Sequence, residues 1–380
     1  MKKYLELFTD GFDSTVAEKT KVENHPYVGY SPNEGVVFTV IPGPVTDGPW
    51  VTFTAQEDGS SIGLQKLSPN QTLEYSTDTT TWNTFKWSLY GQKTNISLNN
   101  GDKVYVRGVL SADNNLTNHT QFKMTGKIAA SGNCNALWNY QDLNAPLKAY
   151  CGYHMFQDCT SLTTAPELPA TELAEYCYFN MFSGCTSLTT APELPATELA
   201  EYCYYCMFQD CTSLTTAPEL PATILAEGCY WLMFKYCTKL TTAPEILPAT
   251  TLAASCYSNM FYGCTSLTSA PELPATELAN ECYLNMFLGC TSLTTAPELP
   301  ATELANKCYL NMFRDCTSLT YIKCLATDIS ATDCTKNWVN GVSSTDGTFV
   351  KHPDMNDWPT NDTANSSGIP SGWTVEDAVI

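Results

Sequence analysis

Basic residues are scarce in this sequence. The 380-residue chain holds 19 lysines and arginines against 39 aspartates and glutamates, a formal net charge of −20 at pH 7. Phosphate backbones repel such a chain, so we expect no nucleic-acid partner. Charged residues make up only 15% of the sequence, whereas hydrophobic residues make up 43%, which is enough for a substantial core.

Long apolar runs are also lacking. No stretch is long enough to cross a bilayer, so we expect no membrane insertion. Glu6, Thr9 and Asp10 interrupt the apolar core that a signal peptide would need after Lys2 and Lys3. If Met1 is the native start, we expect no export by a standard signal-peptide route.

Signatures of catalysis and of metal binding are missing as well. There are only four histidines, and none of them recurs with a period. The sequence holds no phosphate-binding loop, no paired Ser/His/Asp motif and no C-x-x-C spacing in its repeats. We therefore expect a protein that is not an enzyme, with no catalytic residues, no metal ion and no cofactor.

The first third of the chain changes in character along its length. Residues 1–35 are polar and rich in turn formers, which suggests an N-terminal anchoring segment. Residues 36–130 hold six short alternating segments, which predict an immunoglobulin-like β-sandwich. These segments are VVFTVI, WVTFTA, QTLEYS, TNISL, KVYVRGVL and TQFKMTG. Residues 131–150 are interpreted as a junction and as the N-terminal cap of the region that begins at residue 151.

Cysteine is abundant, and its spacing reveals an internal repeat. Fourteen of the 18 cysteines fall into two classes that step by 26 residues, with one step of 27 where Ile246 is inserted. A fixed period of this length predicts a solenoid, here over residues 151–345. The two classes are Cys151, Cys177, Cys203, Cys229, Cys256, Cys282 and Cys308, and Cys159, Cys185, Cys211, Cys237, Cys264, Cys290 and Cys316.

Each repeat is interpreted as one helix and one strand. Thr171 suits a helix N-cap, and Leu173, Cys177 and Met181 come after it at the spacing of one helix face. The β-branched stretch 186–191 suits a short strand that pairs with its equivalent in the next repeat. The cysteines fall on the apolar side, so we expect buried, reduced thiols rather than disulfides or zinc ligands. Cys206 lies outside both classes and is expected to be exposed.

The repeat resembles the BspA-like (Treponema-type) bacterial leucine-rich repeats, whose units run as C-x-x-L-x-x-I-x-I-P…A-F-x-x-C. The matching positions are Cys185, Leu188, Ala191, Pro195, Met181 and Phe182, and the resemblance covers residues 148–345. The fold class predicted in this way is mixed α/β, with the β-sandwich followed by a leucine-rich-repeat solenoid of strand–helix units. Residues 346–380, with Phe349, Trp358 and Trp373, are expected to form a C-terminal cap. This closing part is similar to that of leucine-rich repeat proteins of gut Bacteroides and their phages.

Three columns of repeated side chains are candidates for a binding face. The threonine column is Thr163, Thr189, Thr215, Thr241, Thr268 and Thr294, and the acidic column is Glu167, Glu193, Glu219, Glu245, Glu272 and Glu298. Each has a plainer interpretation, strand propensity for the threonines and a solvated edge for the glutamates. A third column, Tyr178, Tyr204, Tyr230, Tyr257, Tyr283 and Tyr309, suggests core packing, with sugar stacking as the alternative.

The pattern favours display over catalysis. The sequence leads us to expect a bacteriophage virion structural protein, a fibre or capsid decoration, located at the virion surface. Its partners would be other virion proteins, through the N-terminal segment, and a host-surface protein or glycan. The alternative is an adhesin of the bacterial cell surface. A homotrimer is one oligomeric state to consider, because fibres are often trimeric. No heptad pattern supports a coiled coil.

Overall fold

The fold was obtained as a computed structural model, which describes residues 48–380 except 89, 344–345, 357 and 362–366. The chain divides into two compact units, Met1–Pro49 and Trp50–Ile380. The predicted anchoring segment, residues 1–35, and the strand predicted at residues 36–41 lie outside the described residues. The helix and strands of the described residues all belong to the second unit.

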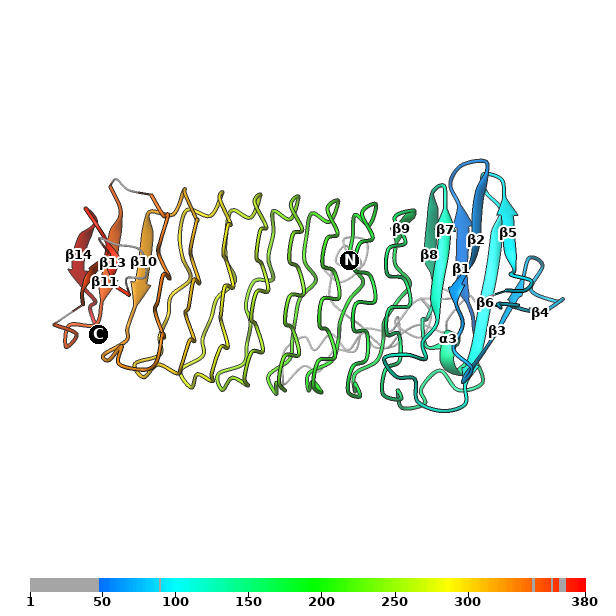
Figure 1. The fold of residues 1–380 in the computed structure, drawn as a ribbon, viewed down its shortest axis with the longest axis horizontal. Helices are drawn as coiled ribbons and strands as arrows, with labels where there is room; N and C mark the ends of the chain where they lie inside the picture. Colours follow the sequence, from blue (N-terminus) through cyan, green and yellow to red (C-terminus); the bar gives the residue numbers. More distant parts are fainter. Residues whose placement is uncertain (1–47, 89, 344–345, 357, 362–366) are drawn as a thin grey trace, which may run out of the picture. The chain divides into compact units, whose positions relative to one another are not determined.

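Two β-sheets form the N-terminal part of this unit (Figure 1). One sheet has the order β4-β3-β6-β1-β8-β9 and the other the order β5-β2-β7. The strands are β1 (Val51–Ala55), β2 (Ser60–Lys66), β3 (Gln71–Ser76), β4 (Asn83–Thr84), β5 (Asn95–Leu98), β6 (Lys103–Leu110), β7 (Gln121–Thr125), β8 (Ile128–Ser131) and β9 (Leu162–Thr164).

The core between the two sheets is aromatic. The ring of Phe53 in β1 lies 5.4 Å from that of Phe122 in β7, and both side chains are buried. Strand β6 buries every second residue, as its alternating sequence predicts. Five strands coincide with predicted segments, whereas β2 and β8 were not foreseen because Ser, Gly and Ala weaken their alternation.

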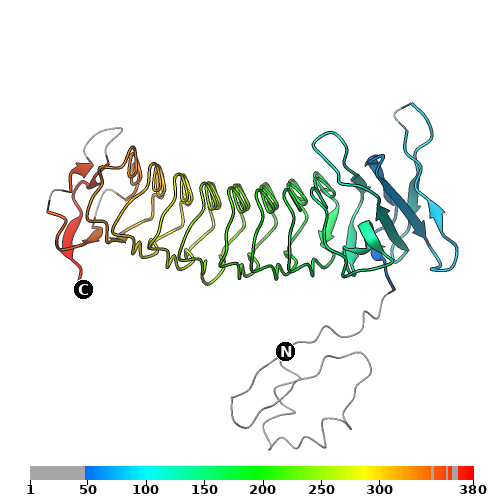
Figure 2. The same ribbon diagram turned by 90° about the horizontal axis from the view of Figure 1, so that it is seen from below.

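The repeats form a stack of coils of 26 residues, with one of 27, beginning with residues 151–176 and 177–202 (Figure 2). Backbone hydrogen bonds alternate in direction along one side of every coil. Met181 N donates to Tyr178 O at 3.1 Å within its own coil, and the next residue, Phe182, donates to Met207 O of the following coil at 3.0 Å. Half of the N–H groups on this side therefore close tight turns, and the other half join neighbouring coils.

The predicted helix in each repeat is wrong. A positive φ recurs at four-residue spacing, for example at Tyr176 (56°), Asn180 (53°) and Gly184 (74°), and an α-helix excludes that conformation. Among the described residues the α-helical segment is α3 (Ala136–Asn139), which precedes the first coil. A chain of four-residue turns buries the same positions, i, i+4 and i+8, that a helix face would, which is why the pattern misled.

The strand predicted in each repeat is shorter in the structure than the sequence suggested. In most coils the threonine stretch makes one isolated parallel bridge to its neighbour, as between Thr216 and Thr242. Among the described residues of the coils, extended strands occur in the first coil, as β9, and in the coil that begins at Cys308, as β10 (Tyr321–Cys324). The strand–helix leucine-rich-repeat solenoid and the mixed α/β class are thus corrected to a nearly all-β chain built of turns and bridges.

The prediction that residues 36–130 form an immunoglobulin-like sandwich is corrected as well. An immunoglobulin-like sandwich is a self-contained pair of antiparallel sheets. Here β8 pairs in parallel with β9 of the first coil, so the six-stranded sheet runs directly into the stack. The main-chain N–H of Phe122 in the other sheet likewise donates to Met155 O of the first coil at 2.8 Å.

One hydrophobic core runs through the two sheets and all the coils. Phenylalanines at equivalent positions stack ring on ring, as do Phe182 and Phe208, with centroids 5.6 Å apart and an interplanar angle of 4°. At the far end Trp338 stacks on Trp358, with centroids 5.8 Å apart, and covers the last coil. The closing strands are β11 (Thr348–Lys351) and β14 (Thr374–Asp377) beside β10, and the pair β12 (Thr360–Asn361) and β13 (Ile369–Pro370).

Candidate functional site

The threonine column lies on the surface of the stack. Five of its members are exposed, and Thr163 in the first coil is half-buried. The Thr163 hydroxyl donates to Gln56 Oε1 at 2.8 Å, and the Thr241 hydroxyl donates to Thr215 O of the preceding coil at 3.1 Å. Both hydroxyls donate their proton to another group of the protein, so what they offer outward is an acceptor oxygen and a methyl group.

The glutamate column is exposed along its whole length. Lys323 pairs with Glu298 at 2.9 Å, and Glu219 Oε2 accepts a hydrogen bond from Glu245 N at 3.3 Å. Within the described part of the chain, no group of three or more His, Cys, Asp or Glu side chains is arranged to hold a metal ion. The column is therefore a strip of charge along the stack rather than a set of chelating sites.

The tyrosine column is buried, with exposures of 1–2%. Neighbouring rings such as Tyr230 and Tyr257 stack on each other with centroids 5.6 Å apart. Burial raises the pKa of these phenols well above the usual value, as for Tyr230. These rings pack the core and offer no face to a ligand.

All 18 cysteines are free and buried. The second class acts as hydrogen-bond donors between coils: Cys211 Sγ lies 3.1 Å from Phe182 O, and Cys237 Sγ lies 3.0 Å from Phe208 O. Cys206, expected to be exposed, is only 4% exposed, because its turn folds the thiol toward Gln209 Oε1 at 3.1 Å. The thiols thus belong to the packing of the stack.

Two columns of aromatic residues on the turn side of the first coils were not foreseen from the sequence, and all their members are half-buried except Tyr153, which is buried. Tyr150 and Tyr176 stack with centroids 4.7 Å apart, and Phe179 and Tyr205 stack at 4.3 Å. The complete columns are Tyr150, Tyr176 and Tyr202, and Tyr153, Phe179, Tyr205 and Trp231. The sequence did hold a signal for these columns: an aromatic residue recurs at these positions with the 26-residue period, but only in the first repeats.

These aromatic columns present mainly ring edges, because most rings stack on a neighbour. The exception is Tyr205 with Trp231, which meet at an interplanar angle of 75°. The last ring of the first column, Tyr202, lies against Gly228, where an added Cβ would come within 2.5 Å of the ring. The Tyr202 hydroxyl donates to Glu227 at 2.7 Å, which raises the pKa of Tyr202 to about 12. The columns therefore give this side of the stack an amphipathic surface of ring edges, hydroxyls and carboxylates.

Among the described residues, no helix is long and apolar enough to span a membrane. The chain was compared with protein-family models, with curated proteins and with solved structures, and none of the three comparisons found a match.

Proposed function

We propose that this chain is a non-enzymatic structural protein of a bacteriophage virion, a fibre or a capsid decoration, that presents its stack of coils to a host-surface glycan or protein. The observation that carries the proposal is the regularity of the exposed columns. The same threonine and glutamate recur once per coil on a rigid stack with a continuous core. Identical groups at fixed intervals favour many weak, simultaneous contacts with a repetitive surface.

The charge of the chain limits the classes of partner that it can bind. With a net charge of −20, the surface favours neutral or cationic partners over anionic ones. Exposed threonines supply acceptors and methyl groups without added charge, which suits a neutral glycan. Attachment to other virion proteins is assigned to residues 1–35, and a homotrimer is the oligomeric state to test first.

Binding is tested with the full chain on an array of neutral and charged glycans and on host-surface extracts. The variant Thr215→Val/Thr241→Val/Thr268→Val removes three hydroxyls from the threonine column at constant shape. The matched control Thr197→Val/Thr223→Val/Thr250→Val makes the same change at exposed threonines of another side of the coils. We expect tenfold or greater loss of binding in the first variant only. Equal binding by both variants would reject the threonine column as the binding face.

The second candidate is an adhesin of the bacterial cell surface, which the same repetitive face would serve. The two settings differ in where the chain resides. Immunogold labelling and mass spectrometry of purified phage particles should detect the chain, and removal of residues 1–35 should release it from the particles. Labelling of uninfected bacterial cells, without any signal on particles, would favour the adhesin instead.

A further inference from the structure

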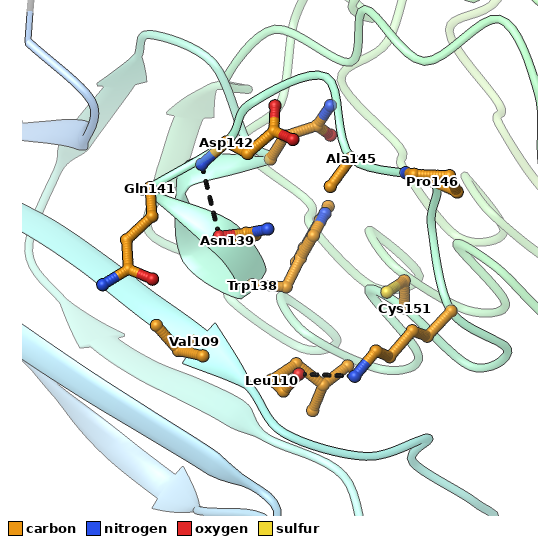
Figure 3. Close-up of a pocket in the computed structure, with 11 residues that line it drawn as sticks. Val109, Leu110, Trp138, Asn139, Gln141, Asp142, Ala145, Pro146 and Cys151 are labelled. Carbon is orange, nitrogen blue, oxygen red and sulfur yellow. Dashed lines mark hydrogen bonds between the residues drawn. The ribbon is translucent and has the colours of Figure 1, made fainter.

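A cavity of about 200 Å³ opens where the sheets meet the first coil (Figure 3). Its walls come from β6, from α3 and from the segment 141–148 that leads into the stack. Val109 and Leu110 form one apolar wall, and Ala145 and Pro146 form the opposite one. None of these residues belongs to the repeated columns, so the cavity is a single site rather than one of a series.

Two buried polar atoms of the cavity lining have no hydrogen-bond partner among the described residues. They are Nε1 of Trp138, a residue 5% exposed, and Oδ1 of Asn135, a residue 6% exposed. The indole nitrogen of Trp138 points toward Ala145 across the cavity (Figure 3). One unmatched group is a donor and the other an acceptor, and leaving such groups unpaired in the interior is costly.

The charges around the cavity limit what can occupy it. Lys148 is the cationic residue of the lining, and its ammonium donates to Leu110 O at 2.8 Å, across the base of the site. Asp142, an exposed residue, contributes a carboxylate at the opening. A carboxylated or phosphorylated ligand would meet this carboxylate while the cation is already engaged, so a neutral ligand is favoured.

A hydroxyl group is suited to either unmatched atom, because it can accept from an indole N–H and can donate to an amide oxygen. An apolar cavity of roughly 150 Å³ can bind benzene. This cavity, of about 200 Å³, therefore has room for one six-membered ring. Apolar walls on both sides suit the C–H faces of such a ring. We propose that the cavity binds one neutral, hydroxyl-rich ring, the terminal hexose of a host-surface glycan.

This inference rests on the proposed glycan-binding function, and its test reads the cavity directly. Neutral hexoses at millimolar concentration are titrated into the ¹⁵N-labelled full chain, and the indole N–H signals are followed by NMR. The signal of Trp138 is the one that disappears in Trp138→Phe. We expect it to shift with at least one of glucose, galactose, mannose, N-acetylglucosamine and fucose, and not with N-acetylneuraminic acid.

Two variants and a control complete the experiment. Trp138→Phe removes Nε1 together with part of the indole ring and should weaken hexose binding tenfold or more, and Ala145→Phe should fill the cavity and abolish binding. Trp87→Phe is the matched control, since Trp87 also has an unpartnered Nε1 and lies outside the cavity lining. No shift with any neutral hexose, or binding unchanged in both cavity variants, would overturn the proposal.

The outcomes separate the cavity from the threonine column. If Ala145→Phe abolishes glycan binding and the threonine variant does not, the cavity is the binding site. If the threonine variant loses binding and Ala145→Phe retains it, the cavity proposal fails while the proposed function stands. If the full chain binds no glycan of the array and no hexose, both proposals of glycan recognition fail together.

Discussion

The ring of Phe122 in β7 stacks on the ring of Phe156 in the first coil, with centroids 5.2 Å apart and an interplanar angle of 12°. Phe156 in turn stacks on Phe182 of the second coil at 5.5 Å, which begins the column that runs through the coils. The sheets thus supply the first member of the repeat's own aromatic column. They cover the first end of the stack with a surface that already has the shape of a coil.

Phe122→Ala should therefore destabilise the sheets and the first coil together. Loss of a fully buried phenylalanine costs about 3–5 kcal/mol of the free energy of unfolding. Urea unfolding gives the total, and hydrogen exchange by mass spectrometry should show faster exchange both in β1 and in residues 151–176. Tyr90→Ala, at a side chain 96% exposed, serves as control and should change stability by less than about 0.5 kcal/mol. Faster exchange in the sheets alone would contradict a shared core.

The thiols should resist alkylation in the native protein. Burial raises the pKa of Cys229 and of Cys282 to about 12 and that of Cys185 well above its usual value, so their thiolate forms are negligible at pH 8. Brief treatment with iodoacetamide at pH 8, followed by intact-mass measurement, should leave the native chain almost unmodified. All 18 cysteines should be alkylated after denaturation. A deficit of about 2 Da per cysteine pair under non-reducing conditions would instead indicate disulfides and reject the reduced ladders.

Stability should decrease as the pH falls from about 6.5 to about 4. The His119 and His154 rings stack at 5.1 Å where the β6–β7 loop meets the first coil. Burial, then the nearby Lys66 and His154, lower the pKa of His119 to about 4, and burial also lowers that of His154 against the opposing effects of Gln157 and Asp158. The unfolded chain binds more protons than the native one in this range, so acid favours unfolding.

The magnitude of this effect is measured by urea unfolding at several pH values. His119 is partly exposed, so its contribution is reduced to about 1–2 kcal/mol. His119→Gln should flatten the dependence between pH 6.5 and 4. An equal slope in the His119 variant would reject the role of the stacked pair.

Leu232→Asn should stabilise the stack. Leu232 has a φ of 62°, and the equivalent residues of later coils are asparagines, which tolerate that conformation. There Asn285 Nδ2 donates to Asn259 Oδ1 at 3.0 Å, so the new amide can extend an existing ladder. We expect a gain of about 1 kcal/mol in urea unfolding. Leu284→Asn, at a half-buried leucine without a positive φ, should give no gain, and a gain at both positions would point to a cause other than the backbone.

The arrangement of the candidate sites was only partly predictable. The threonine and glutamate columns lie on the surface because repeated polar residues between buried leucines must face outward in a stack. The cavity could not be foreseen, because it joins β6 to residues 135–151 through pairings that leave no local pattern. The aromatic columns were overlooked because their period is shared with the buried tyrosines, and sequence alone does not separate the two.

The sequence by itself determined the period, the burial of the cysteines that recur with it and the alternation of strands such as β6. Each of these results from the hydrophobic effect acting on a repeated pattern, whatever path the backbone takes. The backbone path was decided by tertiary structure. Cys177, Met181 and Cys185 suit one face of a helix as well as a chain of four-residue turns. The turns form because neighbouring coils accept half of their N–H groups, as Met207 O does for Phe182 N, and those partners exist only once the coils have stacked.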